Sequence, residues 1–160
     1  HELCERVYFM GSASKIPHMQ GGFATYFDAL PEQCVKVPAE LPMEAAAMAE
    51  PVSVCLHAVK RAGDVKGKSV LIVGAGPIGL ITMMVARMKG AASITVADIA
   101  EAPLAYARKL GADTTIDVKA GDQPLRDAGA KKPFDIAFEA SGAPAGFCVG
   151  HRTSGLVAPA

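Results

Sequence analysis

From about residue 67 onward, short apolar stretches alternate with longer segments in which apolar residues recur every three to four positions. This alternation predicts strands and amphipathic helices in turn, which together form a parallel sheet with right-handed crossovers. The helix expected at 77–89, for example, carries Ile78, Ile81, Val85 and Met88 on one face. This part of the chain is therefore expected to be α/β. The predicted strands are 68–73, 93–98, 113–118 and 134–139, and the predicted helices are 77–89, 101–110 and a poorly defined turn near 122–129.

The first 66 residues follow a different pattern. Strand-like pieces separated by glycine and proline lie at 6–10, 22–28 and 34–37, which are too few for a closed barrel of about five strands. An alanine-rich stretch then favours a helix over 43–50. Pro51 either ends this helix or occupies the first position of a second one, which we expect to reach Arg61.

The composition restricts the kinds of function. Hydrophobic residues make up 51% of the chain and charged residues 20%, so the chain can bury a core. Acidic and basic residues balance at 16 each, which argues against nucleic acid or an anionic membrane as a partner. No apolar run reaches the roughly 18–20 residues of a membrane helix, and no charged leader precedes a cleavage site. We expect a soluble, cytoplasmic protein.

Four cysteines, at positions 4, 34, 55 and 148, form no C-x-x-C pair and have no nearby histidine of the zinc-finger kind. A complete zinc site is therefore not visible in the sequence. The even number also allows disulfides, but the sparse spacing in an α/β chain favours reduced thiols.

A glycine-rich turn, G-x-G-x-x-G, follows the first predicted strand and opens the first predicted helix. Gly74 allows a tight turn, Gly76 lets the backbone approach a pyrophosphate, and Gly79 lets the helix pack closely. Phosphates are favoured at a helix N-terminus, because its N–H groups are unpaired and its dipole attracts negative charge. We predict a dinucleotide-binding site at this turn, which also contains Pro77 and Ile78.

Asp98 ends the second predicted strand, 19 residues after Gly79. A carboxylate at this place accepts hydrogen bonds from the adenosine ribose hydroxyls and repels a 2′-phosphate. The next residues, Ile99 and Ala100, bring no arginine to hold such a phosphate. We therefore predict NAD rather than NADP as the cofactor. Asp98 as a cap of helix 101–110 is the alternative, and the two roles are compatible.

Three further positions carry weaker signals. Ser141 follows the fourth predicted strand, where it either lines the dinucleotide groove or caps an ordinary turn. Glu50 lies beside Pro51 at the junction of the two regions, where domain clefts form, although most glutamates beside proline are solvated helix-end charges. His57 is expected to be a packed or surface residue.

Five short motifs occur together in this chain. They are Gly21-Gly22-Phe23 with Tyr26, Ala49-Glu50-Pro51, Gly74 to Gly79, Leu110-Gly111-Ala112-Asp113 and Ala140-Ser141-Gly142. Together they resemble the medium-chain zinc-dependent alcohol and polyol dehydrogenases, and the stretch from Phe9 to Phe23 is similar to the L-idonate 5-dehydrogenase and sorbitol dehydrogenase branch. The resemblance covers about residues 1–145.

The resemblance implies a fold and a reaction. In this family a GroES-like β domain holds the catalytic zinc, a Rossmann domain holds NAD, and hydride passes from a secondary alcohol of a polyol or sugar acid to the nicotinamide. The implied domains are a remnant of the GroES-like domain at 1–50, a connecting helix at 51–66 and an incomplete Rossmann domain at 67–150. A tail unrelated to the family is expected at 151–160.

The resemblance also assigns individual residues. Glu50 matches the acid that lies at the catalytic zinc, as a ligand or through a water. Phe9 matches a residue that lines the substrate pocket, and Cys4 matches the last of four cysteines around a structural zinc. The family's first catalytic ligands and its other three lobe cysteines have no counterpart in this sequence. We therefore expect that this chain alone does not bind zinc.

The chain departs from the family after residue 145, so we expect a truncated sheet of about four strands instead of six. Strand 134–139 would then be an exposed edge, open to pairing with another chain. We expect a fragment that is inactive alone; the alternative is an NAD-binding or structural relic without catalysis. A zinc-free NADPH reductase would need an arginine or lysine after the second strand, which the sequence lacks. Family members usually form dimers or tetramers, which makes a homo-oligomer a further expectation.

Overall fold

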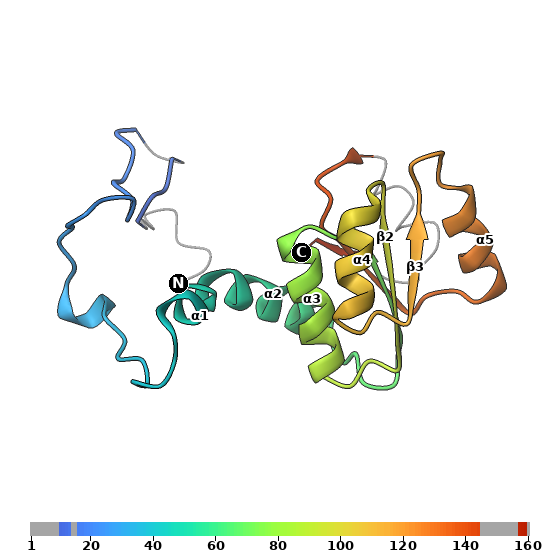
Figure 1. Cartoon of the computed structure of the whole chain (residues 1–160), viewed down its shortest axis with the longest axis horizontal. Coiled ribbons are helices and arrows are strands. Elements are labelled where there is room, and N and C mark those ends of the chain that lie inside the picture. The colour runs from blue at the N-terminus through green and yellow to red at the C-terminus, as the bar shows by residue number, and fades with distance from the viewer. Residues whose placement is uncertain (1–9, 14–15, 145–156, 160) are drawn as a thin grey trace. The chain divides into compact units, whose positions relative to one another are not determined.

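The structure is a computed structural model that describes residues 10–13, 16–144 and 157–159. The chain divides into two compact units, His1–Leu41 and Pro42–Ala160. The second unit contains α1 (Met43–Ala47), α2 (Ala49–Arg61), β1 (Ser69–Val73), α3 (Pro77–Met88), β2 (Ser93–Asp98), α4 (Glu101–Lys109), β3 (Thr114–Asp117), α5 (Gln123–Lys131), β4 (Ile136–Glu139) and β5 (Val157–Pro159) (Figure 1). No described helix is long and apolar enough to cross a bilayer.

The described part of the first unit is made of turns and bends. The Gly11 N–H donates to the Gln20 carbonyl at 3.0 Å, and the short helix η1 (Pro31–Gln33) is its only regular element among residues 10–13 and 16–41. The strands predicted at 22–28 and 34–37 are therefore wrong, and most of the piece at 6–10 lies outside the described residues. A strand needs a neighbouring strand to complete its backbone hydrogen bonds, and among the described residues of this unit there is none.

Helices α1 and α2 follow one another with a single residue, Met48, between them. The second helix begins at Ala49 and not at Pro51 as predicted. Proline is tolerated at its third position because the first N–H groups of a helix have no intrahelical partner. The Val52 N–H makes the first such bond, to the Met48 carbonyl at 3.0 Å.

The sheet is parallel, with the strand order β3-β2-β1-β4-β5. Its central strand β1 is buried along its whole length, as expected for a strand covered on both faces. The order reverses between β1 and β4, because the chain goes outward to β2 and β3 and then crosses back. The predicted α/β class and the four predicted strands are confirmed.

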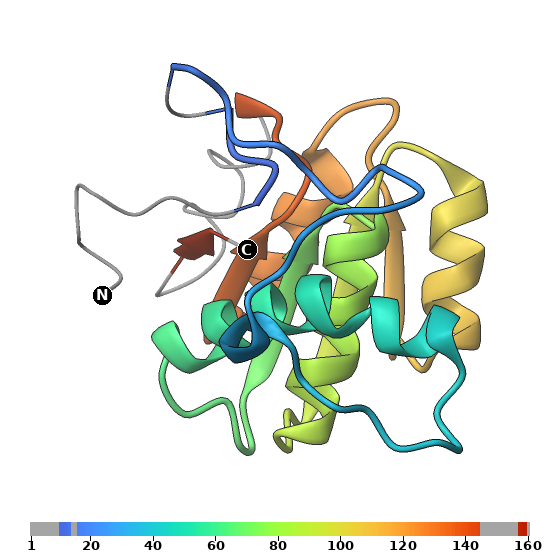
Figure 2. The same cartoon turned by 90° about the vertical axis from the view of Figure 1, so that its left-hand side faces the viewer.

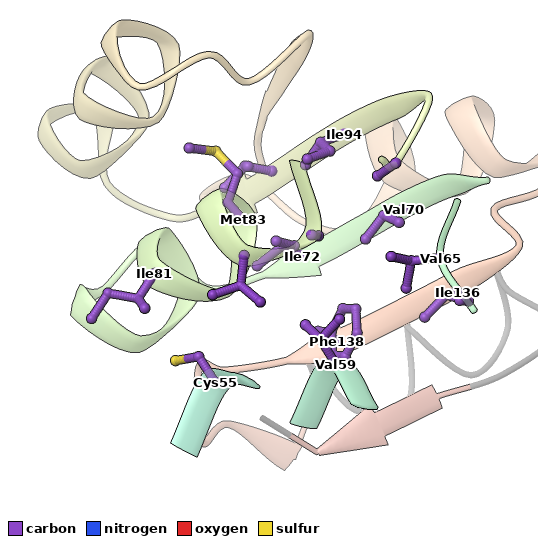
Figure 3. Close-up of a cluster of buried hydrophobic side chains, with 14 of the residues drawn as sticks. Cys55, Val59, Val65, Val70, Ile72, Ile81, Met83, Ile94, Ile136 and Phe138 are labelled. Atoms are coloured by element: carbon purple, nitrogen blue, oxygen red, sulfur yellow. The ribbon is translucent and has the colours of Figure 1, made fainter. Parts of the chain in front are cut away.

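Two apolar clusters cover the two faces of this sheet. The larger one joins α2, α3 and α4 to β1, β2 and β4, and Figure 3 shows Phe138 and Ile72 of the sheet within it beside Val59 of α2. The smaller cluster places Leu125 of α5 on the other face, over Leu71 and other residues. The predicted poorly defined turn near 122–129 is thus a complete helix. Its local sequence is weak, but burial of Leu125 stabilises it.

The sheet has a fifth strand, β5, which the sequence did not predict. Strand β5 has three residues and pairs in parallel with β4, in register Ala137 to Val157 and Glu139 to Pro159; Figure 2 shows it beside β4. The edge of β4 is therefore covered and not exposed as expected. A strand edge with free N–H and C=O groups favours such pairing.

Candidate functional site

A cleft of about 650 Å³ lies at the carboxyl ends of the strands, where the strand order reverses. Ligands of open parallel sheets bind at this position, because the loops after the strands diverge there. The cleft is formed by the loops that follow β1, β2, β3 and β4. It is lined by Val73, Gly74, Gly76, Ala97, Asp98, Ile99, Val118, Gly121, Asp122, Leu125, Ala140, Ser141 and Ala143.

Two glycines make the turn after β1 possible. Gly74 has φ +103°, and a Cβ built on it would lie 2.7 Å from the carbonyl carbon of Ala140 and from the nitrogen of Ser141. A Cβ on Gly79 would lie 1.9 Å from the Gly74 carbonyl oxygen. The turn, the loop after β4 and helix α3 therefore pack at backbone distance, which no other residue allows.

The start of α3 offers unpaired backbone donors to the cleft. Gly76 is the residue before the helix, and no side chain caps the helix there. Within the part of the chain that the structure describes, the N–H groups of Gly76, Ile78 and Gly79 have no hydrogen-bond partner, and Pro77 has no N–H. A Cβ on Gly76 would meet nothing within 4 Å. This open cradle of donors at a positive helix end suits an anion.

Asp98 lies at the end of β2 and is bonded to the turn. Its Oδ2 accepts the Ala75 N–H at 2.6 Å, and its Oδ1 accepts the Ala100 N–H at 2.9 Å. The alternative role of Asp98, as a cap of α4, is absent, since no side chain caps that helix. Each carboxylate oxygen retains a second lone pair, so Asp98 can still accept hydrogen bonds from a ligand's hydroxyl groups.

The loop after β4 is held by a carboxylate that the sequence did not single out. Glu139 accepts the Ser141 N–H at 2.8 Å, the Gly142 N–H at 3.3 Å and the Ser141 hydroxyl. The Ser141 Oγ in turn accepts the Ala143 N–H at 3.1 Å. Ser141 lines the cleft, and its hydroxyl also fixes a turn; its part in binding a dinucleotide stays a prediction.

The loop between β3 and α5 supplies a wall of the cleft that sequence reasoning missed. Val118, Gly121, Asp122 and Leu125 line it. The signal for them was the rule already applied to the other strands, that loops at the carboxyl ends of parallel strands meet at one edge.

Glu50 stands apart from this cleft. It is exposed in the first turn of α2, where its backbone carbonyl accepts the Ser53 hydroxyl at 2.7 Å. Among the described residues, no three His, Cys, Asp or Glu side chains lie close enough to hold a metal ion. Phe9 and Cys4 lie outside the described residues. The described donor set therefore does not fit a zinc ion.

Known proteins similar to this chain are dehydrogenases, which is consistent with a nucleotide-binding cleft. Residues 77–150 match the family model of the zinc-binding dehydrogenases. The L-idonate 5-dehydrogenase (NAD(P)(+)) of Escherichia coli is 38% identical over 141 residues, which are 88% of this chain and 41% of that protein. The sorbitol dehydrogenase of Gallus gallus is 41% identical over 119 residues, 74% of this chain and 32% of that protein.

A solved structure has the same fold as this chain over most of its length. The crystal structure of L-idonate 5-dehydrogenase from E. coli superposes with a TM-score of 0.87 and 35% identity, over 95% of this chain and 44% of that one. This chain thus spans about two fifths of the length of its curated relative from E. coli. The motifs, the cleft and these matches together show that the chain belongs to the zinc-binding dehydrogenases, a family of oxidoreductases.

Proposed function

We propose that this chain forms the NAD-binding part of a dehydrogenase that oxidises a secondary alcohol of a polyol or sugar acid, as the name of its L-idonate 5-dehydrogenase relative suggests. The observation that carries the proposal is the convergence of three features on one cleft. These are the glycine turn, the unpaired N–H groups of α3, and the Asp98 carboxylate.

In this proposal, different residues of the cleft bind different parts of the cofactor. The N–H groups of Gly76, Ile78 and Gly79 receive the pyrophosphate, and Pro77 directs the chain into α3. Asp98 accepts the adenosine ribose hydroxyls, and Ser141 lies along the groove on the far side of Gly74. Bound NAD supplies the acceptor for the hydride.

Asp98 also favours NAD over NADP in this proposal. Its carboxylate would repel a 2′-phosphate, and the exposed Ile99 and Ala100 beside it carry no positive charge. The name of the E. coli relative gives both cofactors for that protein. The preference is therefore a property of this chain's own residues.

The remaining assignments follow from the family. We propose that 1–50 derive from the catalytic domain, 51–66 from the connecting helix and 67–150 from the NAD-binding domain, with 151–160 as an unrelated tail. Glu50 would then lie near the metal of a complete enzyme, Phe9 at its substrate and Cys4 at its structural zinc. A cytoplasmic location, a small-molecule substrate and a homo-oligomer belong to the same proposal.

Titration calorimetry of the purified chain with NAD and with NADP tests the cofactor assignment. We expect saturable NAD binding, weaker NADP binding, and loss of both in Gly76→Asp, which sets a carboxylate where the phosphates bind. Ala130→Asp is the matched control, because it adds the same charge at an exposed position of α5 outside the cleft. No heat from either nucleotide with the folded chain would favour the alternative, a structural relic without a ligand.

A further inference from the structure

The Asp98 carboxylate accepts two backbone hydrogen bonds, which point to a second, structural role for this residue. We propose that Asp98 is a positioning residue for the glycine-rich turn, so that the side chain that selects the nucleotide also sets the geometry of the phosphate site. The inference deepens the proposed function and rests on it for the identity of the ligand. Its structural half, that Asp98 fixes the turn, can be tested without any ligand.

The turn is held from the end of β2 by two successive residues. The Ala97 carbonyl accepts the Gly74 N–H at 2.8 Å, and the Asp98 Oδ2 accepts the next N–H, that of Ala75, at 2.6 Å. Ala75 is only 1% exposed, so water does not readily replace a lost acceptor. Among the described residues, Asp98 is the only side chain that bonds the backbone of residues 74–76.

A carboxylate is required because two N–H groups point at this side chain. Ala75 and Ala100 each donate to a different oxygen of Asp98. An asparagine offers one acceptor and one donor, and therefore satisfies one of the two N–H groups while its own NH₂ faces the other. An alanine satisfies neither.

The position of the turn decides where the phosphate donors lie. Ala75 immediately precedes Gly76, the first of the three unpaired N–H groups at the start of α3. A turn released from Asp98 moves these donors relative to the rest of the cleft. Substitutions at position 98 that are meant to admit a 2′-phosphate therefore also loosen the site for the pyrophosphate, which both nucleotides share.

Hydrogen exchange of the full chain without ligand tests the structural half. In Asp98→Ala we expect the Ala75 amide to exchange about tenfold faster or more, because it loses its acceptor. Asp98→Asn should accelerate exchange at Ala75 or Ala100. The control is Asp117→Ala, which removes the corresponding carboxylate from the end of β3, where among the described residues it accepts only the Lys119 N–H, at 2.7 Å. Wild-type exchange at both Ala75 and Ala100 in both Asp98 variants would overturn the proposal, whether or not the chain binds NAD.

Binding of two nucleotides separates positioning from direct contact. ADP carries the ribose hydroxyls, whereas 2′,3′-dideoxyadenosine diphosphate lacks them and so has nothing for the carboxylate to bind directly. We expect Asp98→Ala to weaken both, about tenfold for the dideoxy compound and more for ADP. Unchanged affinity for the dideoxy compound would limit Asp98 to the ribose contact. If wild-type chain binds neither nucleotide, the proposed function fails while the exchange experiment still decides the role of Asp98 in the turn.

Discussion

At the scale of single residues, the glycines of the turn are not equivalent. Gly79 has no room for a Cβ, since that atom would lie 1.9 Å from the Gly74 carbonyl oxygen, whereas a Cβ on Gly76 would meet nothing within 4 Å. Gly76 also has φ −68°, which any residue adopts. The fold therefore requires glycine at position 79 but not at position 76, where only the proposed phosphate site gives glycine a role.

This difference predicts opposite results for two alanine variants. Gly79→Ala should lower the free energy of unfolding by about 3 kcal/mol, because the turn and helix must separate. Gly76→Ala should change it by less than about 0.5 kcal/mol and weaken NAD binding about tenfold or more by crowding the phosphates. Urea unfolding and calorimetry measure the two effects. Equal stability of both variants would contradict this account of the turn.

At the scale of elements, the first residues of β1 and the residue before β4 are joined by a carboxylate. The Asp135 Oδ2 accepts the Ser69 N–H at 2.7 Å and the Ser69 hydroxyl at 2.9 Å. These hydrogen bonds, with the nearby Lys68 and Lys132, hold the pKa of Asp135 below its ordinary value of 3.8. The interaction links β1 and β4 at their amino ends, which is the end of the sheet opposite the cleft.

The lowered pKa predicts a pH dependence of stability. A carboxyl group whose pKa is lower in the folded state stabilises the fold above its unfolded pKa, and this contribution is lost as the pH falls through the folded pKa. Asp135→Asn should therefore lower the melting temperature near neutral pH and flatten its decline below about pH 4. Asp127→Asn is the control, since within the described part of the chain that exposed side chain bonds only Gln123 of its own helix. Identical pH profiles of wild type and Asp135→Asn would refute the assignment.

The packing of α2 against the sheet predicts how much a buried aromatic ring contributes to stability. Phe138 of β4 is fully buried in the cluster that α2 closes. Phe138→Ala should lower the free energy of unfolding by about 3–5 kcal/mol through the cavity that it leaves. Tyr106→Ala, at a 60% exposed position of α4, should cost under about 1 kcal/mol, mostly its contact with Lys109. Denaturant unfolding of the two variants compares a buried with an exposed aromatic ring.

The success of sequence reasoning followed the range of the interactions involved. Strand β1 is a continuous apolar run and helix α3 has a clear helical period, so both were predicted to within one residue. Helix α5 was underestimated because its own Leu125 packs against residues that are distant in the sequence, such as Leu71. The role of Glu139 and the contact of Asp98 with Ala75 depend on loops that meet only after folding, and no local pattern announces them.

At the scale of the whole molecule, the described residues offer a candidate nucleotide site but no candidate metal site. The chain also spans only about two fifths of the length of its E. coli relative. We therefore expect cofactor binding to be separable from turnover in this protein.

The separation predicts that the purified chain, supplied with zinc, reduces no NAD in the presence of L-idonate or sorbitol. The absorbance of reduced nicotinamide measures the rate, and Gly76→Asp provides the background, because it removes nucleotide binding in our proposal. A rate above this background would show that the chain completes a catalytic site by itself. Metal analysis of the same preparation reports whether zinc is retained.

The cleft is encoded by a continuous part of the sequence. Four loops build it, yet all of its lining residues in the described part of the chain fall between Val73 and Ala143, in one uninterrupted stretch. A single recombination event at either end of that stretch moves the entire cleft into another gene without dividing it. A gene fragment that keeps this stretch therefore keeps every lining residue of the cleft, whatever else it has lost.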